Sequence, residues 1–140
     1  MADAFYVEYR NAMLGAWTHS FPDLNTDNTK VGLRDEGATA LNLVTQVDHA
    51  DISSALVATS ANVGSPTVGV VAAGVFDHDN VTFSTVSGAS VESLDYYKDS
   101  GVSSTSPLLA NIDSATGLPV TPNGGDITWT PSASGVWQIT

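Results

Sequence analysis

Residues 77–80, with the sequence DHDN, form the first candidate for a metal site in this chain. Asp77 and Asp79 stand two positions apart, and clustered carboxylate oxygens are the ligands that hard cations such as Ca²⁺ prefer. A calcium-binding loop also needs further oxygen ligands and a distal glutamate at fixed spacing, and neither follows here. Asp and Asn are equally typical of turns, because their side chains hydrogen-bond the neighbouring backbone. We interpret DHDN as a turn between two strands and expect no metal and no cofactor.

Histidines and possible nucleophiles give little support for catalysis. His19, His49 and His78 are far apart in the sequence, and the carboxylates that flank His49 and His78 would tend to raise their pKa values. The segments VSGAS and SASG do not match the G-x-S-x-G turn that presents a serine nucleophile, and the chain contains no cysteine. The Gly-rich PNGGD precedes a predicted strand rather than a helix, so it does not form a phosphate-binding loop.

Enzymatic activity is therefore not expected. Paired carboxylates for glycoside hydrolysis can lie far apart in a sequence, so a small hydrolase stays open as a weaker alternative. Glutamate is scarce, however, and the aspartates are concentrated in turns. We predict that the protein is not an enzyme and assign no catalytic residue.

The charge of the chain is strongly one-sided. Four basic residues stand against fifteen acidic ones, which gives a formal net charge of −11. A nucleic-acid-binding protein neutralises phosphates with Lys and Arg, and an anionic membrane surface would repel this chain. No apolar run is long enough to span a bilayer, and the N-terminus lacks the basic end and apolar core of a signal peptide. We expect neither nucleic acid nor membrane as a partner, whereas a basic protein surface would complement the acid.

The pattern of short apolar runs predicts a β fold. The 140 residues suit a single domain, so we expect residues 1–140 to form one unit. Alternating or β-branched runs separated by turn signals are typical of a mainly β fold, here an antiparallel β-sandwich with a jelly-roll-like arrangement. Residues 38–47 fit either a strand or a short helix, and 44–53 favour a helix or loop. Strands are predicted at residues 30–35, 55–63, 66–76, 80–86, 90–98, 107–113, 126–131 and 135–140.

The N-terminal segment predicts a short helix over residues 4–14, because every fourth residue from position 5 to position 13 is aromatic or Met. Asp3 is a candidate N-cap, and Gly15 is placed to end the helix. Two interpretations stay open. The helix covers one end of the core, or residues 1–28 dock on another chain. The candidate interface residues of the second interpretation are Phe5, Tyr6, Tyr9, Met13 and Trp17.

Aromatic residues in the C-terminal half allow several roles. Trp129 and Trp137 lie in consecutive predicted strands, which predicts a cross-strand pair in the core. Tyr96 and Tyr97 must point to opposite faces of their strand, so we expect one of them to face outward. Exposed aromatic rings would instead suit a sugar-binding platform or an interface between proteins.

Several short motifs between residues 81 and 130 share one order and spacing. They are VTF (81–83), YKDSG (97–101), SPL (106–108), ID (112–113) and TGLPVTPNGGDIT (116–128). In this order the block resembles the C-terminal half of a family of small structural proteins encoded by tailed bacteriophages. The short predicted helix followed by VGLRD near the N-terminus is similar too, whereas the final segment WTPSASGVWQIT departs from the family pattern.

The resemblance implies a component of the virion without catalytic residues. We expect a capsid decoration (cement) protein that binds the major capsid protein, stabilises the assembled head and forms a homo-oligomer. Its location would be the virion, assembled in the host cytoplasm. The alternative is a binding module of a tail or head fibre that recognises a host surface glycan through Tyr96 and Trp129.

Overall fold

The structure is a computed structural model, and it describes residues 3–16 and 22–139. Trp17 and His19 therefore lie outside the described residues. The elements follow one another along the chain as β1 (Ala4–Phe5), α1 (Val7–Met13), β2 (Thr29–Arg34), α2 (His49–Ile52), η1 (Ser53–Ala55), β3 (Leu56–Thr59), β4 (Thr67–Val68), β5 (Val75–Asp77), β6 (Val81–Phe83), β7 (Ser93–Lys98), η2 (Ser103–Thr105), β8 (Leu108–Ile112), β9 (Ile127–Trp129) and β10 (Trp137–Gln138).

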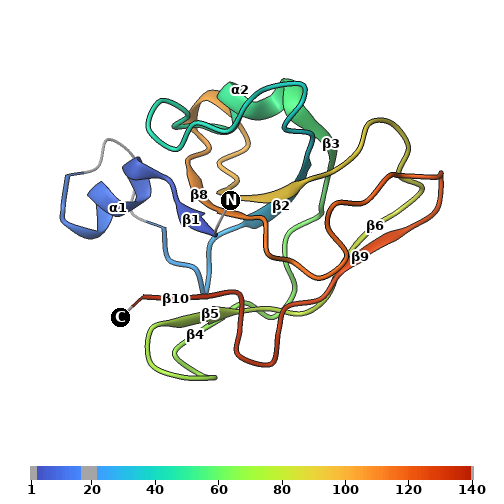
Figure 1. Cartoon of the computed structure of the whole chain (residues 1–140). Helices are drawn as coiled ribbons and strands as arrows, with labels where there is room; N and C mark the ends of the chain where they lie inside the picture. Colours follow the sequence, from blue (N-terminus) through green and yellow to red (C-terminus); the bar gives the residue numbers. More distant parts are fainter. Residues whose placement is uncertain (1–2, 17–21, 140) are drawn as a thin grey trace.

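A five-stranded antiparallel sheet organises the molecule, with the strand order β1-β8-β7-β2-β3. Its second layer consists of two small antiparallel sheets, β10-β5-β4 and β6-β9. Figure 1 shows α2 at the top of the molecule and β4, β5 and β10 at the bottom. The predicted mainly β, antiparallel sandwich with a short N-terminal helix is confirmed.

The main core lies between the five-stranded sheet and the two small sheets. Alternation places Val31 and Leu33 of β2 on the inner face, where both are buried against Phe76 and Phe83 of the second layer. The remaining buried members of this core are Tyr9, Leu24, Val63, Val81, Val86, Val91, Leu94, Tyr96, Leu109, Ala110, Ile112 and Ala115.

The other face of the five-stranded sheet is covered by residues 36–56, which include α2 and η1. A second apolar cluster forms there from Tyr6, Ile52, Tyr97 and Leu108, all buried. Tyr96 and Tyr97 do point to opposite faces, but both are buried, because each face has its own cover. The expectation that one tyrosine faces outward is therefore wrong.

Helix α1 begins three residues later than predicted, because Ala4 and Phe5 pair with Asn111 and Ala110 of β8. Asp3 does not cap the helix. Its carboxylate instead accepts hydrogen bonds from the backbone of residues 113 and 114, both at 2.9 Å. Gly15 ends the helix as predicted, with a positive φ of 85°.

Two further sequence predictions are corrected by the strand pairing. Residues 66–76 form a hairpin, β4 and β5, rather than one interrupted strand. Trp129 and Trp137 do not pair across strands, because β9 pairs with β6 and β10 pairs with β5. By contrast, the predicted helix or loop at 44–53 is confirmed by α2, which begins with a reciprocal capping box between Asp48 and Asp51.

Replacement of Gly135 tests how closely the last hairpin packs. Gly135 has a φ of +88°, and a Cβ there would overlap Val75 Cγ1 and stand 2.9 Å from the carbonyl oxygen of Phe76. Gly101 has a φ of +83° with nothing within 4 Å, so it is the matched control. We expect Gly135→Ala to lower the free energy of unfolding in urea by about 1–3 kcal/mol more than Gly101→Ala. Equal losses of unfolding free energy in the two variants would show that the hairpin rearranges to accommodate the methyl group.

Candidate functional site

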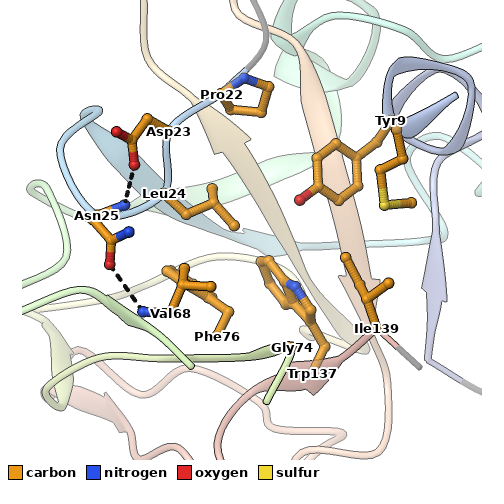
Figure 2. Close-up of a pocket in the computed structure, with 11 residues that line it drawn as sticks. Tyr9, Pro22, Asp23, Leu24, Asn25, Val68, Gly74, Phe76, Trp137 and Ile139 are labelled. Carbon is orange, nitrogen blue, oxygen red and sulfur yellow. Dashed lines mark hydrogen bonds between the residues drawn. The ribbon is translucent and has the colours of Figure 1, made fainter. Parts of the chain in front are cut away.

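An apolar groove with a volume of about 400 Å³ lies on the described surface. It lies between α1, the loop that precedes β2, and the sheet of β4, β5 and β10 (Figure 2). Ligand pockets usually measure about 300–1,000 Å³, so the groove could hold a small molecule or a few side chains. The residues that line this apolar groove are Tyr9, Met13, Pro22, Asp23, Leu24, Asn25, Val68, Gly74, Phe76, Trp137 and Ile139.

Aromatic contacts fix the wall of the groove. The Trp137 ring packs on Phe76 with a centroid distance of 4.6 Å, and it meets Tyr96 edge-on at 5.1 Å. Phe5 meets the same indole edge-on at a centroid distance of 5.8 Å, and the Phe5 ring also packs, tilted, on the Tyr9 ring at 5.6 Å. Figure 2 shows Tyr9 and Trp137 on one side of the groove and Leu24 on the other. These ring contacts leave the wall little freedom to rearrange, because each ring is held by its neighbours.

A turn in the loop of residues 22–28 forms the opposite wall. Asp23 Oδ1 accepts a hydrogen bond from the backbone N–H of Asn25 at 3.0 Å, and the Asn25 side-chain oxygen accepts from the N–H of Val68 at 2.9 Å (Figure 2). Asp27 accepts from the N–H of Asp23 and forms an ion pair with Lys98 at 2.8 Å. The sequence PDLNTDNT predicted a turn, and the structure adds that this turn closes the exposed edge of β4.

Exposed apolar side chains surround the mouth of the groove. Val68 and Ile139 line it and expose 40% and 42% of their surface. Val70 and Val71 extend this surface along the tip of the β4–β5 hairpin, and Leu14 follows the lining residue Met13. Large apolar side chains that gather at one place on a surface mark a contact site more often than scattered ones do.

The structure places the five predicted interface residues in different environments. Tyr6 is fully buried and has no surface to offer another chain, and Tyr9 exposes 3%. Phe5 and Met13 are half-buried, and Tyr9 and Met13 line the groove. Trp17 lies outside the described residues. The contact of this segment with another chain stays a prediction. Sequence reasoning missed Leu24, Val68 and Ile139, since each is an ordinary apolar residue until the fold brings them together.

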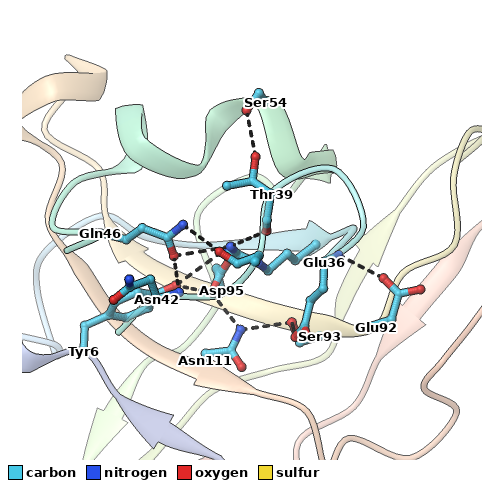
Figure 3. Close-up of polar contacts among 12 residues, drawn as sticks. Tyr6, Glu36, Thr39, Asn42, Gln46, Ser54, Glu92, Ser93, Asp95 and Asn111 are labelled. Carbon is cyan, nitrogen blue, oxygen red and sulfur yellow. Dashed lines mark hydrogen bonds and ion pairs between the residues drawn. The ribbon is translucent and has the colours of Figure 1, made fainter. Parts of the chain in front are cut away.

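The most concentrated polar chemistry in the described chain is buried. Arg34 and Asp95, whose side chains are inaccessible to solvent, form an ion pair at 2.8 Å. The second Asp95 oxygen accepts hydrogen bonds from the Tyr6 hydroxyl at 2.7 Å and the Asn111 amide at 2.9 Å (Figure 3). Burial and the nearby Asp95 carboxylate raise the pKa of Tyr6 well above its usual value, so its hydroxyl stays protonated and donates.

The same cluster ties residues 36–46 to the sheet. Arg34 donates to the backbone oxygen of Thr39 at 2.8 Å and to the Gln46 side chain at 3.3 Å. Ser93 donates to Glu36 at 2.8 Å and accepts from Asn111 at 3.0 Å (Figure 3). No substrate reaches Arg34 or Asp95 in this arrangement, since neither side chain touches solvent. The cluster therefore holds structure together and is not an active site.

His78 takes part in a second buried chain of hydrogen bonds. Its Nδ1 lies 2.6 Å from the carbonyl oxygen of Asp79, so we assign the ring proton to Nδ1. Nε2 then accepts from the Tyr96 hydroxyl at 2.7 Å, and Tyr96 accepts from the indole N–H of Trp129 at 2.6 Å. Burial lowers the pKa of His78, and burial also lowers that of His49. The expectation that flanking carboxylates raise both pKa values is wrong: at His78 desolvation outweighs Asp77 and Asp79, and at His49 it outweighs Asp99 and Asp95, which are not its neighbours in the sequence.

Neither a metal centre nor a family assignment emerges from the described residues. No group of three His, Asp or Glu side chains within residues 3–16 and 22–139 is arranged to hold a metal ion. Asp79 instead accepts a hydrogen bond from the Ser65 hydroxyl at 2.7 Å.

Within residues 3–16 and 22–139, neither helix has the length and hydropathy required to cross a membrane. No family model matches this sequence, and no curated protein is detectably similar to it.

The pKa of His78 makes stability depend on pH in a defined direction. The unfolded imidazole takes up a proton near pH 6.5, whereas the folded one does so only at lower pH. The contribution is therefore complete above about pH 6.5 and is lost as the pH falls toward the folded pKa, with a slope of at most about 1.4 kcal/mol per pH unit. His78→Gln keeps an acceptor for Tyr96 but does not titrate.

We expect the free energy of unfolding of the wild type to fall between pH 7 and pH 5.5, and the fall to shrink in His78→Gln. Urea titrations at several pH values measure both. His49→Gln is the comparison variant. Burial lowers the pKa of His49 in the same direction, but His49 is less buried, so we expect its replacement to change the pH dependence of the unfolding free energy less than His78→Gln does. An identical slope in the wild type and His78→Gln would contradict the assignment.

Proposed function

We propose that this chain is a non-enzymatic structural protein of a bacteriophage virion, namely a capsid decoration or cement protein. It binds the major capsid protein, self-associates with closed symmetry and stabilises the assembled head. The observation that carries the proposal is how the side chains are distributed. The best-placed groups for chemistry, Arg34 and Asp95, face inward and form an ion pair with each other, whereas apolar side chains face outward around the groove. The resemblance of residues 81–130 to phage structural proteins points to the virion.

The surface charge supports binding to a basic partner. Three of the four basic residues are used in ion pairs within the chain, Arg34 with Asp95, Lys30 with Asp99 at 2.6 Å, and Lys98 with Asp27 at 2.8 Å. The remaining acids dominate the outer charge, which favours association with a positively charged protein surface and speeds the encounter at low salt. A protein that binds only assembled capsid subunits shifts the equilibrium toward the assembled head by mass action.

The second candidate is a fibre module that recognises a host glycan. A smaller cavity of about 230 Å³ favours it, because half-buried Trp129 lines it together with Asp126, Thr116 and Thr128. Aromatic rings beside carboxylates and hydroxyls suit sugars. Tyr96 contributes no exposed surface, since it is fully buried and donates to His78. The platform expected from Tyr96 and Trp129 together is thus reduced to Trp129.

Capsid binding tests the proposal directly. Purified protein is mixed with empty expanded capsids of the phage that encodes it, and bound protein is measured by co-sedimentation. We expect saturable binding at micromolar concentration, weaker binding at high salt, and a higher melting temperature of the decorated shell. A glycan array run in parallel tests the second candidate. No capsid binding at micromolar concentration would contradict the proposal, and specific glycan binding without capsid binding would favour the fibre module.

A further inference from the structure

The apolar groove has the properties of a docking site that another molecule completes. Its walls are buried core residues such as Phe76, yet its mouth exposes Val68 and Ile139. The ring contacts of Trp137 hold one side in place, and the hydrogen bond from Val68 to Asn25 holds the other. A rigid apolar hollow with an exposed apolar mouth favours binding, because little conformational entropy is lost when it is filled.

The charge at the groove restricts what can fill it. Asp23 lines the groove and is exposed, and its carboxylate accepts only a backbone N–H of its own turn among the contacts we describe. None of the described lining residues is basic. Asp27, close by in the same turn, is already neutralised by Lys98. The negative charge at the mouth therefore comes from Asp23, and an occupant gains most by placing a cation beside it.

Other occupants fit this charge less well. A second copy of the chain would bring another surface of net charge −11 toward the first, and three of its four basic residues, Arg34, Lys30 and Lys98, are already paired, which leaves it the exposed Arg10 as a cation to offer. An anionic lipid surface meets the same repulsion. A protein segment that carries apolar side chains between Lys or Arg residues satisfies both the apolar walls and the acidic mouth.

We propose that the apolar groove binds such a segment of a partner protein. An apolar side chain enters between Tyr9, Leu24 and Trp137, and a flanking Lys or Arg pairs with Asp23. The tip of the β4–β5 hairpin, through Val70 and Val71, extends the contact beyond the groove. The identification of the partner as the major capsid protein rests on the proposed function, whereas the chemistry of the segment rests on the groove alone.

Ile139→Asp is the main test variant. Ile139 is exposed at the mouth, and its link to the fold is a backbone hydrogen bond to Gly74 at 3.0 Å, which the substitution keeps. Val44→Asp is the matched control, because Val44 is 66% exposed but does not line the groove. Asp23→Asn keeps the oxygen that accepts from Asn25 and removes only the charge. Equal unfolding free energies of the variants and the wild type establish that the fold is intact.

The first measurement is affinity for the capsid. We expect Ile139→Asp to bind about tenfold more weakly or worse, Val44→Asp to bind like the wild type, and Asp23→Asn to lose part of the salt dependence. Capsid binding that Ile139→Asp leaves unchanged would overturn the groove as the docking site while the proposed function stands. A wild-type dimer that Ile139→Asp dissociates in sedimentation would also overturn the proposal, because it would assign the groove to a second copy.

The second measurement does not depend on the capsid. Methyl NMR spectra of the whole protein are recorded with the peptide Lys-Lys-Leu-Leu-Lys-Lys and with Lys-Lys-Ser-Ser-Lys-Lys, each at millimolar concentration. We expect the leucine peptide alone to shift the methyl signals of Leu24, Val68 and Ile139. Such shifts without any capsid binding would support the groove and contradict the proposed function. Absence of these shifts, or equal shifts with both peptides, would overturn the inference.

Discussion

The buried ion pair between Arg34 and Asp95 is the constraint on which the rest of the structure depends. A charge inside a protein is costly unless it is paired and its remaining hydrogen-bonding groups are satisfied. Arg34 lies at the end of β2 and Asp95 lies within β7, so the pair requires the observed register between these two central strands. The other bonds of the pair require Tyr6 from the N-terminal segment, Asn111 from β8, the backbone oxygen of Thr39 and the side-chain oxygen of Gln46. One interaction thus joins segments that lie far apart in the sequence.

The five-stranded sheet that contains the ion pair also determines which side chains form the wall of the apolar groove. Because residues 36–56 cover one face of it, Tyr97 packs inward with Ile52, and the small sheets must cover the opposite face. There Tyr96 supports both Trp137, through ring contact, and His78, through a hydrogen bond. Trp137 in turn forms the wall of the apolar groove. The polar groups that could do chemistry are used to hold the layers together, and the outer surface keeps acid and exposed apolar side chains, which suits a structural role.

Local patterns predicted the parts of this fold that depend on local physics. Alternation in β2 placed Val31 and Leu33 on one face, and Gly15 ended α1 where a positive φ was needed. The hairpin at residues 66–76 was not predictable, because a continuous apolar run looks alike as one strand or as two. The burial of both Tyr96 and Tyr97 depends on an irregular cover that has no periodic signal. The groove could not be predicted from the sequence either, because Leu24, Val68 and Trp137 come from separate segments that meet only in the folded chain.

A double-mutant cycle tests most directly whether the ion pair organises the fold. Arg34→Met leaves Asp95 buried without its partner charge, and Asp95→Asn does the same to Arg34 while it keeps an oxygen for Tyr6. We expect each single variant to lose about 3–5 kcal/mol of unfolding free energy and the double variant to lose much less than the sum, because no unpaired charge stays buried in it. Small losses that simply add would contradict this expectation, because they would show that the two charges are not coupled.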